Sequence, residues 1–138
     1  MKDLFSLRDK VAVVTGGNGG IGEGIARGLA SVGCGVAVAA RNSSKTEAAV
    51  RRIQKQFQVP VMGVQVDVRE EKEINSMVEK ILDHFGRIDI LVNNAGMNIR
   101  KFPQDVSVED WDEVLNTNLR SALLCSKAVY PAMKKQGG

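Results

Sequence analysis

The chain has 138 residues, of which 43% are hydrophobic and 25% are charged, and these proportions are typical of a globular protein with one core. Its net charge of +3 comes from basic residues scattered along the chain, so we expect no nucleic-acid partner. No apolar run approaches the roughly 18 residues that span a bilayer, and the first residues lack the apolar core of a secretion signal. We therefore expect a cytoplasmic protein with no membrane partner.

Four short apolar runs rich in Val and Ile are candidate strands, at 11–14, 36–40, 61–66 and 88–92. Most lack polar alternation, which is typical of strands covered on both faces. Helical patterns lie between them, with apolar residues three or four apart, at Ile21, Ile25, Leu29 and Val32, at Val50, Ile53 and Phe57, and at Ile74, Met77, Val78, Ile81, Leu82 and Phe85.

This alternation predicts one doubly wound α/β domain over residues 1–138. Right-handed crossovers place its parallel sheet between helix layers in an α/β/α arrangement, with strand order 3-2-1-4. Ligands of such sheets bind at the carboxyl ends of the strands.

Capping residues indicate where the helices begin. Either serine at 43–44 can cap the second helix, and the acidic pair at 70–71 suits the positive end of the third. After a polar loop over 93–103, residues 107–110 resemble a capping box that opens a long helix reaching about Lys135.

The two cysteines, Cys34 and Cys125, lie far apart and outside any Cys-x-x-Cys pattern. This favours buried, reduced thiols over a disulfide framework and predicts no metal site. The one histidine, His84, ends a helical pattern beside Phe85, where a capping or surface role is usual.

The stretch from Val11 to Gly22 joins the first strand to the first helix through a loop almost without side chains. Glycines allow a tight turn and let the backbone approach a phosphate, while the following helix supplies free N–H groups and a positive dipole end. Glycine clusters also form plain turns and close helix–strand contacts, so the loop alone leaves that alternative open.

The spacing Thr15-Gly16-x-x-x-Gly20-Ile21-Gly22 resembles the signature of the short-chain dehydrogenase/reductase family. Asn93-Asn94-Ala95-Gly96, after the fourth strand, matches that family's Asn-Asn-Ala-Gly element. The resemblance covers essentially the whole chain. It implies a Rossmann-type fold, a homo-oligomer, and an oxidoreductase that transfers hydride between a nicotinamide cofactor and an alcohol or carbonyl substrate.

The resemblance also implies cofactor-binding roles in three segments. The glycine loop holds the pyrophosphate, an Asp-Val pair after the third strand contacts the adenine, and small residues after the fourth strand run beside the nicotinamide. An Asp after a strand is otherwise an ordinary turn or cap residue. The residues so assigned are Gly16, Asn18, Gly20, Ile21, Gly22, Asp67, Val68, Asn94, Ala95 and Gly96.

The second strand ends at Arg41, Asn42 and Ser43, where a dinucleotide fold meets the adenosine ribose. An acidic residue there would repel a 2′-phosphate, whereas these three side chains would accept it, so NADP is favoured and NAD is the alternative. An arginine at an exposed strand end is the simpler interpretation of Arg41. No second basic residue lies inside the glycine loop, so we expect a modest preference.

Asn118 resembles the catalytic asparagine of the family, whose side chain bends the helix and holds a water of the proton relay. An asparagine inside a helix competes with backbone hydrogen bonds and is uncommon there without a role. Asn116, two residues before it, is interpreted as a solvated helix position.

The family completes its active site with a serine and a Tyr-x-x-x-Lys that fall beyond Gly138. Tyr130 and Lys134 have that spacing, but Tyr130 lies roughly 18 Å along the helix from Asn118, at 1.5 Å per residue, and Pro131 marks a kinked or ending helix. We therefore expect an incomplete, inactive cofactor-binding part, which needs a complementing C-terminal segment or an oligomer.

A non-catalytic nucleotide-binding or subunit-interaction module is the alternative, with the long helix from Trp111 as its docking face. The substrate is largely beyond prediction. The loop Asn98-Ile99-Arg100-Lys101 resembles that of sugar-acid and polyol dehydrogenases of the family, but an exposed loop cation explains Arg100 equally well.

Overall fold

The computed structural model describes residues 4–137, and a parallel sheet of four strands forms its centre. β1 (Val11–Thr15) pairs with β2 (Gly35–Ala40) on one side and with β4 (Ile90–Val92) on the other, and β3 (Val61–Gln65) pairs with β2. The order β3-β2-β1-β4 confirms the prediction. β1 and β2 are buried along their whole length, as unbroken apolar runs require.

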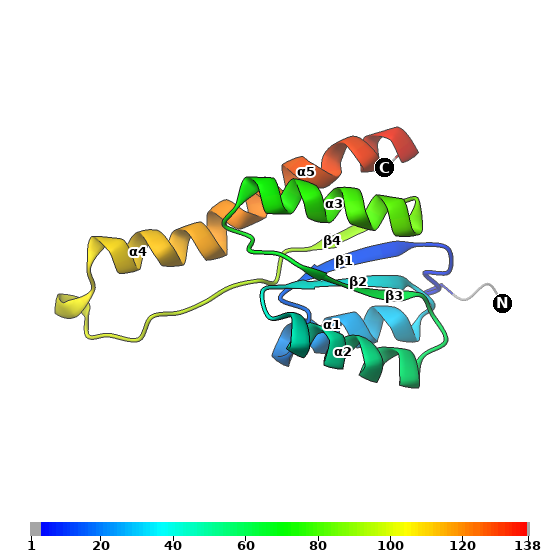
Figure 1. The fold of residues 1–138 in the computed structure, drawn as a ribbon, viewed down its shortest axis with the longest axis horizontal. Helices are drawn as coiled ribbons and strands as arrows, with labels where there is room; N and C mark the ends of the chain where they lie inside the picture. Colours follow the sequence, from blue (N-terminus) through cyan, green and yellow to red (C-terminus); the bar gives the residue numbers. More distant parts are fainter. Residues whose placement is uncertain (1–3, 138) are drawn as a thin grey trace.

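Helices cover both faces of the sheet (Figure 1). α1 (Gly20–Ser31) and α2 (Ser43–Gln56) lie on one face, and α3 (Glu71–Phe85) and α5 (Ser121–Gln136) lie on the other. Each face has its own apolar core, one with Ile74, Met77 and Ile81 of α3, and one with Ile53 of α2. The predicted three-layer arrangement is therefore confirmed.

The buried face of α1 differs from the predicted one. Gly22, Ala26 and Ala30 face the sheet, while Ile21 is 78% exposed at the start of the helix. Small side chains allow the helix to lie close to the strands. The larger side chain of Ile25 is only partly buried and packs at the margin of the core. The apolar spacing identified the helix correctly but assigned Ile21 to the wrong side.

The cap of α2 is Asn42, and the prediction that one of the two following serines caps this helix is wrong. The Asn42 Oδ1 atom accepts a hydrogen bond of 2.9 Å from the backbone N–H of Lys45, and the helix begins at Ser43. Asparagine and serine are equally good caps, so their order along the chain could not be decided from composition alone.

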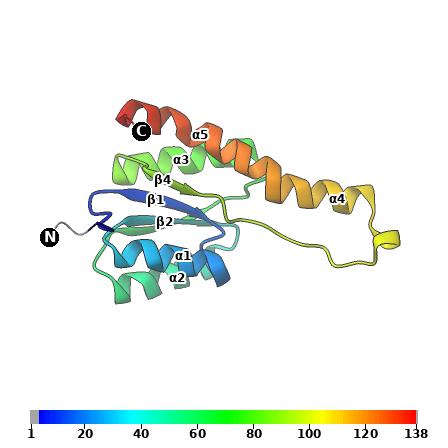
Figure 2. The same cartoon turned by 180° about the vertical axis from the view of Figure 1, so that it is seen from behind.

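The predicted long helix consists of three consecutive segments: α4 (Val108–Leu115), the π-helical turn η2 (Asn116–Arg120) and α5. Ser107 and Asp110 form the expected capping box, and α5 continues through Pro131 to Gln136 rather than ending there. A short 3-10 turn, η1 (Pro103–Asp105), precedes α4. The loop after β4, η1 and α4 together project away from the sheet (Figure 2).

Cys34 and Cys125 are buried, free thiols, as expected, and burial raises the pKa of each to about 11. His84 is exposed and its ring contacts Phe85 edge-on. None of the helices described in residues 4–137 combines the length and the hydropathy needed to cross a bilayer.

Candidate cofactor site

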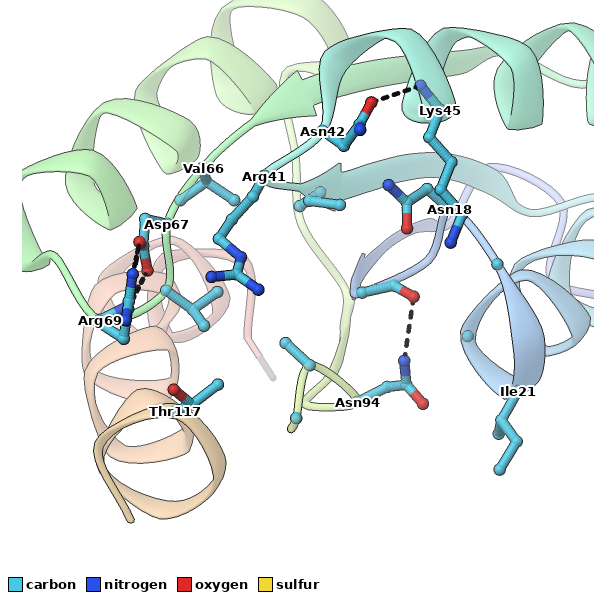
Figure 3. A pocket seen from close by; sticks show the side chains of 18 residues that line it. Asn18, Ile21, Arg41, Asn42, Lys45, Val66, Asp67, Arg69, Asn94 and Thr117 are labelled. Atoms are coloured by element: carbon cyan, nitrogen blue, oxygen red, sulfur yellow. Dashed lines mark hydrogen bonds and ion pairs between the residues drawn. The ribbon is translucent and has the colours of Figure 1, made fainter. Parts of the chain in front are cut away.

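A cavity of about 540 Å³ opens at the carboxyl ends of the strands, where the predicted segments meet (Figure 3). The turn after each of β1, β2, β3 and β4 contributes to its wall. The lining residues are Gly16, Asn18, Gly19, Ile21, Gly22, Ala39, Ala40, Arg41, Asn42, Lys45, Val66, Asp67, Val68, Arg69, Asn94, Ala95, Gly96 and Thr117.

Close packing leaves no room for side chains at Gly16 and Gly22, where the glycine loop meets the turn after β4 and the start of α1. Gly16 adopts a left-handed φ of 65°, and a Cβ there would lie 3.0 Å from the Cα of Ala95. A Cβ on Gly22 would collide with the carbonyl oxygen of Gly16 and the side-chain nitrogen of Asn94. These contacts bring the backbone of the loop and the start of α1 to the cavity wall without intervening side chains.

Asn94 and Thr15 join the glycine loop to the turn after β4. Asn94 Nδ2 donates to the carbonyl oxygens of Thr15 and Gly16 at 3.0 and 3.2 Å. Thr15 Oγ1 accepts from the backbone N–H groups of Asn94 and Ala95 at 3.1 and 3.0 Å and donates to Val92 O at 3.2 Å. The Asn-Asn-Ala-Gly element is thus fixed to the end of β1 by side-chain hydrogen bonds.

Asn18 joins the glycine loop to α2. It is 9% exposed, and its Nδ2 donates to Thr46 Oγ1 at 3.1 Å. Thr46 Oγ1 in turn donates to Asn42 O at 2.8 Å. The Asn18 side chain therefore orders the site through Thr46, a contact that the motif did not reveal.

Cations line the side of the cavity formed by β2 and α2. Arg41 extends from the end of β2 into the cavity, and Lys45 reaches it from the first turn of α2 (Figure 3). Within residues 4–137 neither side-chain cation makes a hydrogen bond or an ion pair. Both side chains are exposed and have no carboxylate partner among these residues, so they are available to bind an anion.

Asp67, by contrast, is neutralised by a neighbour. Arg69 donates from Nε and Nη2 to its carboxylate, the closest approach being 2.6 Å, and also contacts Glu113 at 3.2 Å. The Arg69 hydrogen bonds hold the pKa of Asp67 below its ordinary value. Asp67 is thus an ionised acceptor whose orientation is set by Arg69.

Asn118 lies in the π-helical turn η2 and binds the loop after β4. Its Oδ1 accepts from the Met97 N–H at 2.7 Å, and its Nδ2 donates to Met97 O at 2.9 Å. Single π-turns inside helices occur frequently at functional sites. Asn116 is exposed, as predicted.

Most of the predicted cofactor residues line the cavity, but Gly20, Ser43 and Asn118 are not among the lining residues. Ser43 faces a separate groove between α2 and β3. Seven lining residues were not predicted from the sequence, because side chains from distant segments converge only in the fold. These residues are Gly19, Ala39, Ala40, Lys45, Val66, Arg69 and Thr117. The signal available for Lys45 was its place in a first helical turn, whose side chains lean toward the helix N-terminus.

Thr117 supplies an unpartnered polar atom at the cavity. It is 7% exposed, and within residues 4–137 its Oγ1 is buried without a hydrogen-bond partner. Tyr130 and Lys134 lie outside the cavity lining; Tyr130 is 60% exposed, with the Lys134 ammonium 6.0 Å from its ring.

Three features of the cavity suit a dinucleotide and its phosphate groups. The glycine loop offers closely approachable backbone at a helix N-terminus, and the cations Arg41 and Lys45 line the side formed by β2 and α2. Thr117 Oγ1 lacks a hydrogen-bond partner among residues 4–137. The rest of the wall combines small and apolar residues with the polar side chains of Asn18, Asn42, Asp67, Arg69 and Asn94, a mixture that suits the rings and hydroxyls of a nucleotide.

The solved structure of L-sorbose reductase from Gluconobacter frateurii, complexed with NADPH and L-sorbose, superposes with a TM-score of 0.92 at 33% identity and covers 97% of this chain and 51% of its own. The NADP-dependent mannitol dehydrogenase of Hypocrea jecorina is 37% identical over 140 residues, which are 98% of this chain and 52% of that enzyme. An uncharacterized oxidoreductase of Staphylococcus epidermidis is 37% identical over 133 residues, covering 96% of this chain and 56% of its own.

The chain therefore spans about half the length of the curated relatives it matches. The sequence pattern of the short chain dehydrogenases matches residues 10–138. Fold, motifs and relatives agree, and the chain belongs to the short-chain dehydrogenase family.

Proposed function

We propose that this chain binds NADP(H) and forms the cofactor-binding part of an oxidoreductase acting on an alcohol or carbonyl substrate. The observation that carries the proposal is the guanidinium of Arg41, which lines the cavity without an ion pair or hydrogen bond in residues 4–137, in the place where a carboxylate would select NAD. When bound, the cofactor supplies or accepts the hydride. The chain's own residues bind and orient it.

The backbone of the glycine loop holds the pyrophosphate in this proposal, because the loop and the first residues of α1 line the cavity and a helix N-terminus has free N–H groups. Asp67 and Val68 contact the adenine, and the segment from Asn94 to Gly96 runs beside the nicotinamide. Asn42 contacts the 2′-phosphate beside Arg41 in this proposal, whereas Ser43 lines the neighbouring groove and has no part in the phosphate site.

The test is the cofactor preference of Arg41→Asp. The added carboxylate repels a 2′-phosphate and accepts hydrogen bonds from ribose hydroxyls, so NADPH affinity falls by about tenfold or more while NADH affinity is kept or raised. Fluorescence titration of the chain with each cofactor measures both dissociation constants. Arg51→Asp, in α2 and outside the cavity, is the control. Equal responses to NADPH and NADH would remove the assignment to the 2′-phosphate.

We further propose that the 138-residue chain is inactive by itself. Asn118 is assigned to catalysis in the assembled enzyme, but Tyr130 and Lys134 stand apart from the cavity and do not complete the proton-transfer site. The names of two relatives, a mannitol dehydrogenase and an L-sorbose reductase, support a hydroxyl-rich substrate. Turnover of ketoses with NADPH by this chain alone would contradict the assignment of inactivity.

An apolar face along the projecting helix supports a second function, docking of another subunit. Val108, Trp111, Leu119 and Leu123 are each at least 60% exposed, and they follow one another along α4, η2 and α5. Contiguous exposed apolar surface of this kind marks interaction sites. If a homo-oligomer buries this face, changing Leu119 and Leu123 to Ser dissociates it, and light scattering measures the fall in molecular mass. An unchanged mass would exclude the face from the interface.

A further inference from the structure

Lys45 and Gly19 come from different elements and meet at the edge of the cavity. A Cβ placed on Gly19 would lie 2.8 Å from Nζ of Lys45 and 2.9 Å from its Cε. These separations are shorter than any that real Cβ atoms show, so the end of Lys45 occupies the space where a side chain at Gly19 would begin. In Figure 3 the lysine extends from α2 toward the glycine loop beside Asn18.

Hydrogen bonds fix the backbone that carries Lys45. Its own N–H is bound by the capping Asn42, and the adjacent Thr46 is bonded to both Asn42 and Asn18. The first turn of α2 is therefore attached to the glycine loop through the Asn18–Thr46 hydrogen bond. Because helical side chains lean toward the N-terminus, this attachment directs Lys45 over the loop.

Within residues 4–137 no carboxylate forms an ion pair with Lys45. The nearby Glu23 is held by Arg52 through two hydrogen bonds of 2.8 Å, which lower the pKa of Glu23. Asp67, across the cavity, is held by Arg69. The cavity thus contains two cations, Arg41 and Lys45, that have neither an ion pair nor a hydrogen bond in residues 4–137.

We propose that Lys45 is the second cation of the 2′-phosphate site and that it supplies, from α2, the positive charge that the glycine loop lacks. The inference rests on the proposed NADP(H) function. A phosphate monoester carries about −1.5 to −2 near pH 7, which two cations match. Arg41 offers a planar fork and Lys45 a compact charge, so the two recognise different oxygens of one phosphate. Gly19 admits this arrangement because it has no side chain.

The first test compares Lys45→Met with Lys55→Met, a control at the exposed far end of the same helix. Dissociation constants are measured by fluorescence for NADPH and NADH and by calorimetry for 2′,5′-ADP and 5′-AMP. Loss of a charge-assisted contact weakens the binding of NADPH and of 2′,5′-ADP by about tenfold. NADH and 5′-AMP change less than about twofold, and the control changes none of the four.

Moving the charge provides the second test. Gly19 has an extended φ of 179°, so Lys can be placed there. The double variant Gly19→Lys with Lys45→Met restores NADPH binding, because an ammonium is returned to the same side of the cavity from the loop. Gly19→Ala alone weakens NADPH by displacing Lys45. A double variant no better than Lys45→Met would contradict the placement of both residues at one phosphate.

The remaining outcomes separate the inference from the function on which it rests. Equal losses for NADPH and NADH in Lys45→Met would assign this lysine to the pyrophosphate and overturn the inference. Unchanged binding of both cofactors would overturn it as well. If the wild-type chain binds NADPH no tighter than NADH, the proposed cofactor preference itself fails. Thermal melting of each variant verifies that the changes in binding arise in folded protein.

Discussion

The cationic side chains differ in whether a carboxylate of the protein pairs with them. Arg52, Arg69 and Arg87 each donate two or more hydrogen bonds to a carboxylate, so their charges stabilise the protein. Arg41 and Lys45 have no such partner within residues 4–137 and both line the cavity. The distribution of partners, rather than the count of cations, indicates where an anion binds.

Asp89 makes the protein sensitive to acid, at the opposite edge of the sheet from the cavity. It accepts hydrogen bonds from Arg87, from the Val11 N–H at 2.9 Å and from Lys10, and Arg87 makes the largest contribution to lowering its pKa to about 2. Because the carboxylate is favoured in the folded state, its stabilisation is complete above the unfolded pKa of about 3.9.

As the pH falls from about 5 toward 2, protonation of Asp89 therefore removes about 2 kcal/mol from the free energy of unfolding. Urea unfolding at a series of pH values measures this loss. Asp89→Asn is less stable at pH 7 and shows a correspondingly smaller decline in acid. An acid slope that is the same in the variant and the wild type would assign the sensitivity to other carboxylates.

At the scale of elements, the sequence predicted those whose residues interact locally. Runs rich in Val and Ile, with helical patterns between them, identified all four strands and their order, and Ser107 with Asp110 identified the start of α4. The packing face of α1 was mispredicted because glycine and alanine carry little hydrophobic signal, although their small size allows the closest contact with the sheet.

Site residues were predicted where a motif fixes them and missed where segments meet only in space. Gly16, Gly22 and Asn94 were identified because backbone contacts dictate their type. Lys45 and Arg69 were missed because their roles depend on where α2 and the turn after β3 lie relative to the glycine loop and α4. No local pattern in the sequence contains that distance information.

Asn118, in the π-helical turn η2, bonds to both backbone groups of Met97. We expect Asn118→Ala to lower the free energy of unfolding by about 1 kcal/mol, since the lost hydrogen bonds lie at an exposed position. Hydrogen exchange at the Met97 amide becomes faster in this variant. Asn116→Ala, two residues earlier and exposed, changes stability by less than about 0.5 kcal/mol. Unchanged exchange at Met97 in Asn118→Ala would show that this contact does not hold the loop.

At the scale of the whole molecule, the chain divides into a layered body that carries the cavity and a projecting segment from the loop after β4 through α4 (Figures 1 and 2). Within that segment η1 and α4 contain no buried residue, whereas β1 and β2 are buried throughout. We propose that the body binds the cofactor and that the apolar face along α4, η2 and α5 contacts another subunit.

The most direct test of the central claim, that this cavity is an NADP(H) site, is an NMR titration of amide resonances with NADPH. The account predicts saturable shifts at Gly16, Gly19, Gly22, Val68 and Gly96, with none at Gly33 and Gly35, which lie at the opposite edge of the sheet. Absence of saturable shifts, or shifts confined to that opposite edge, would contradict it.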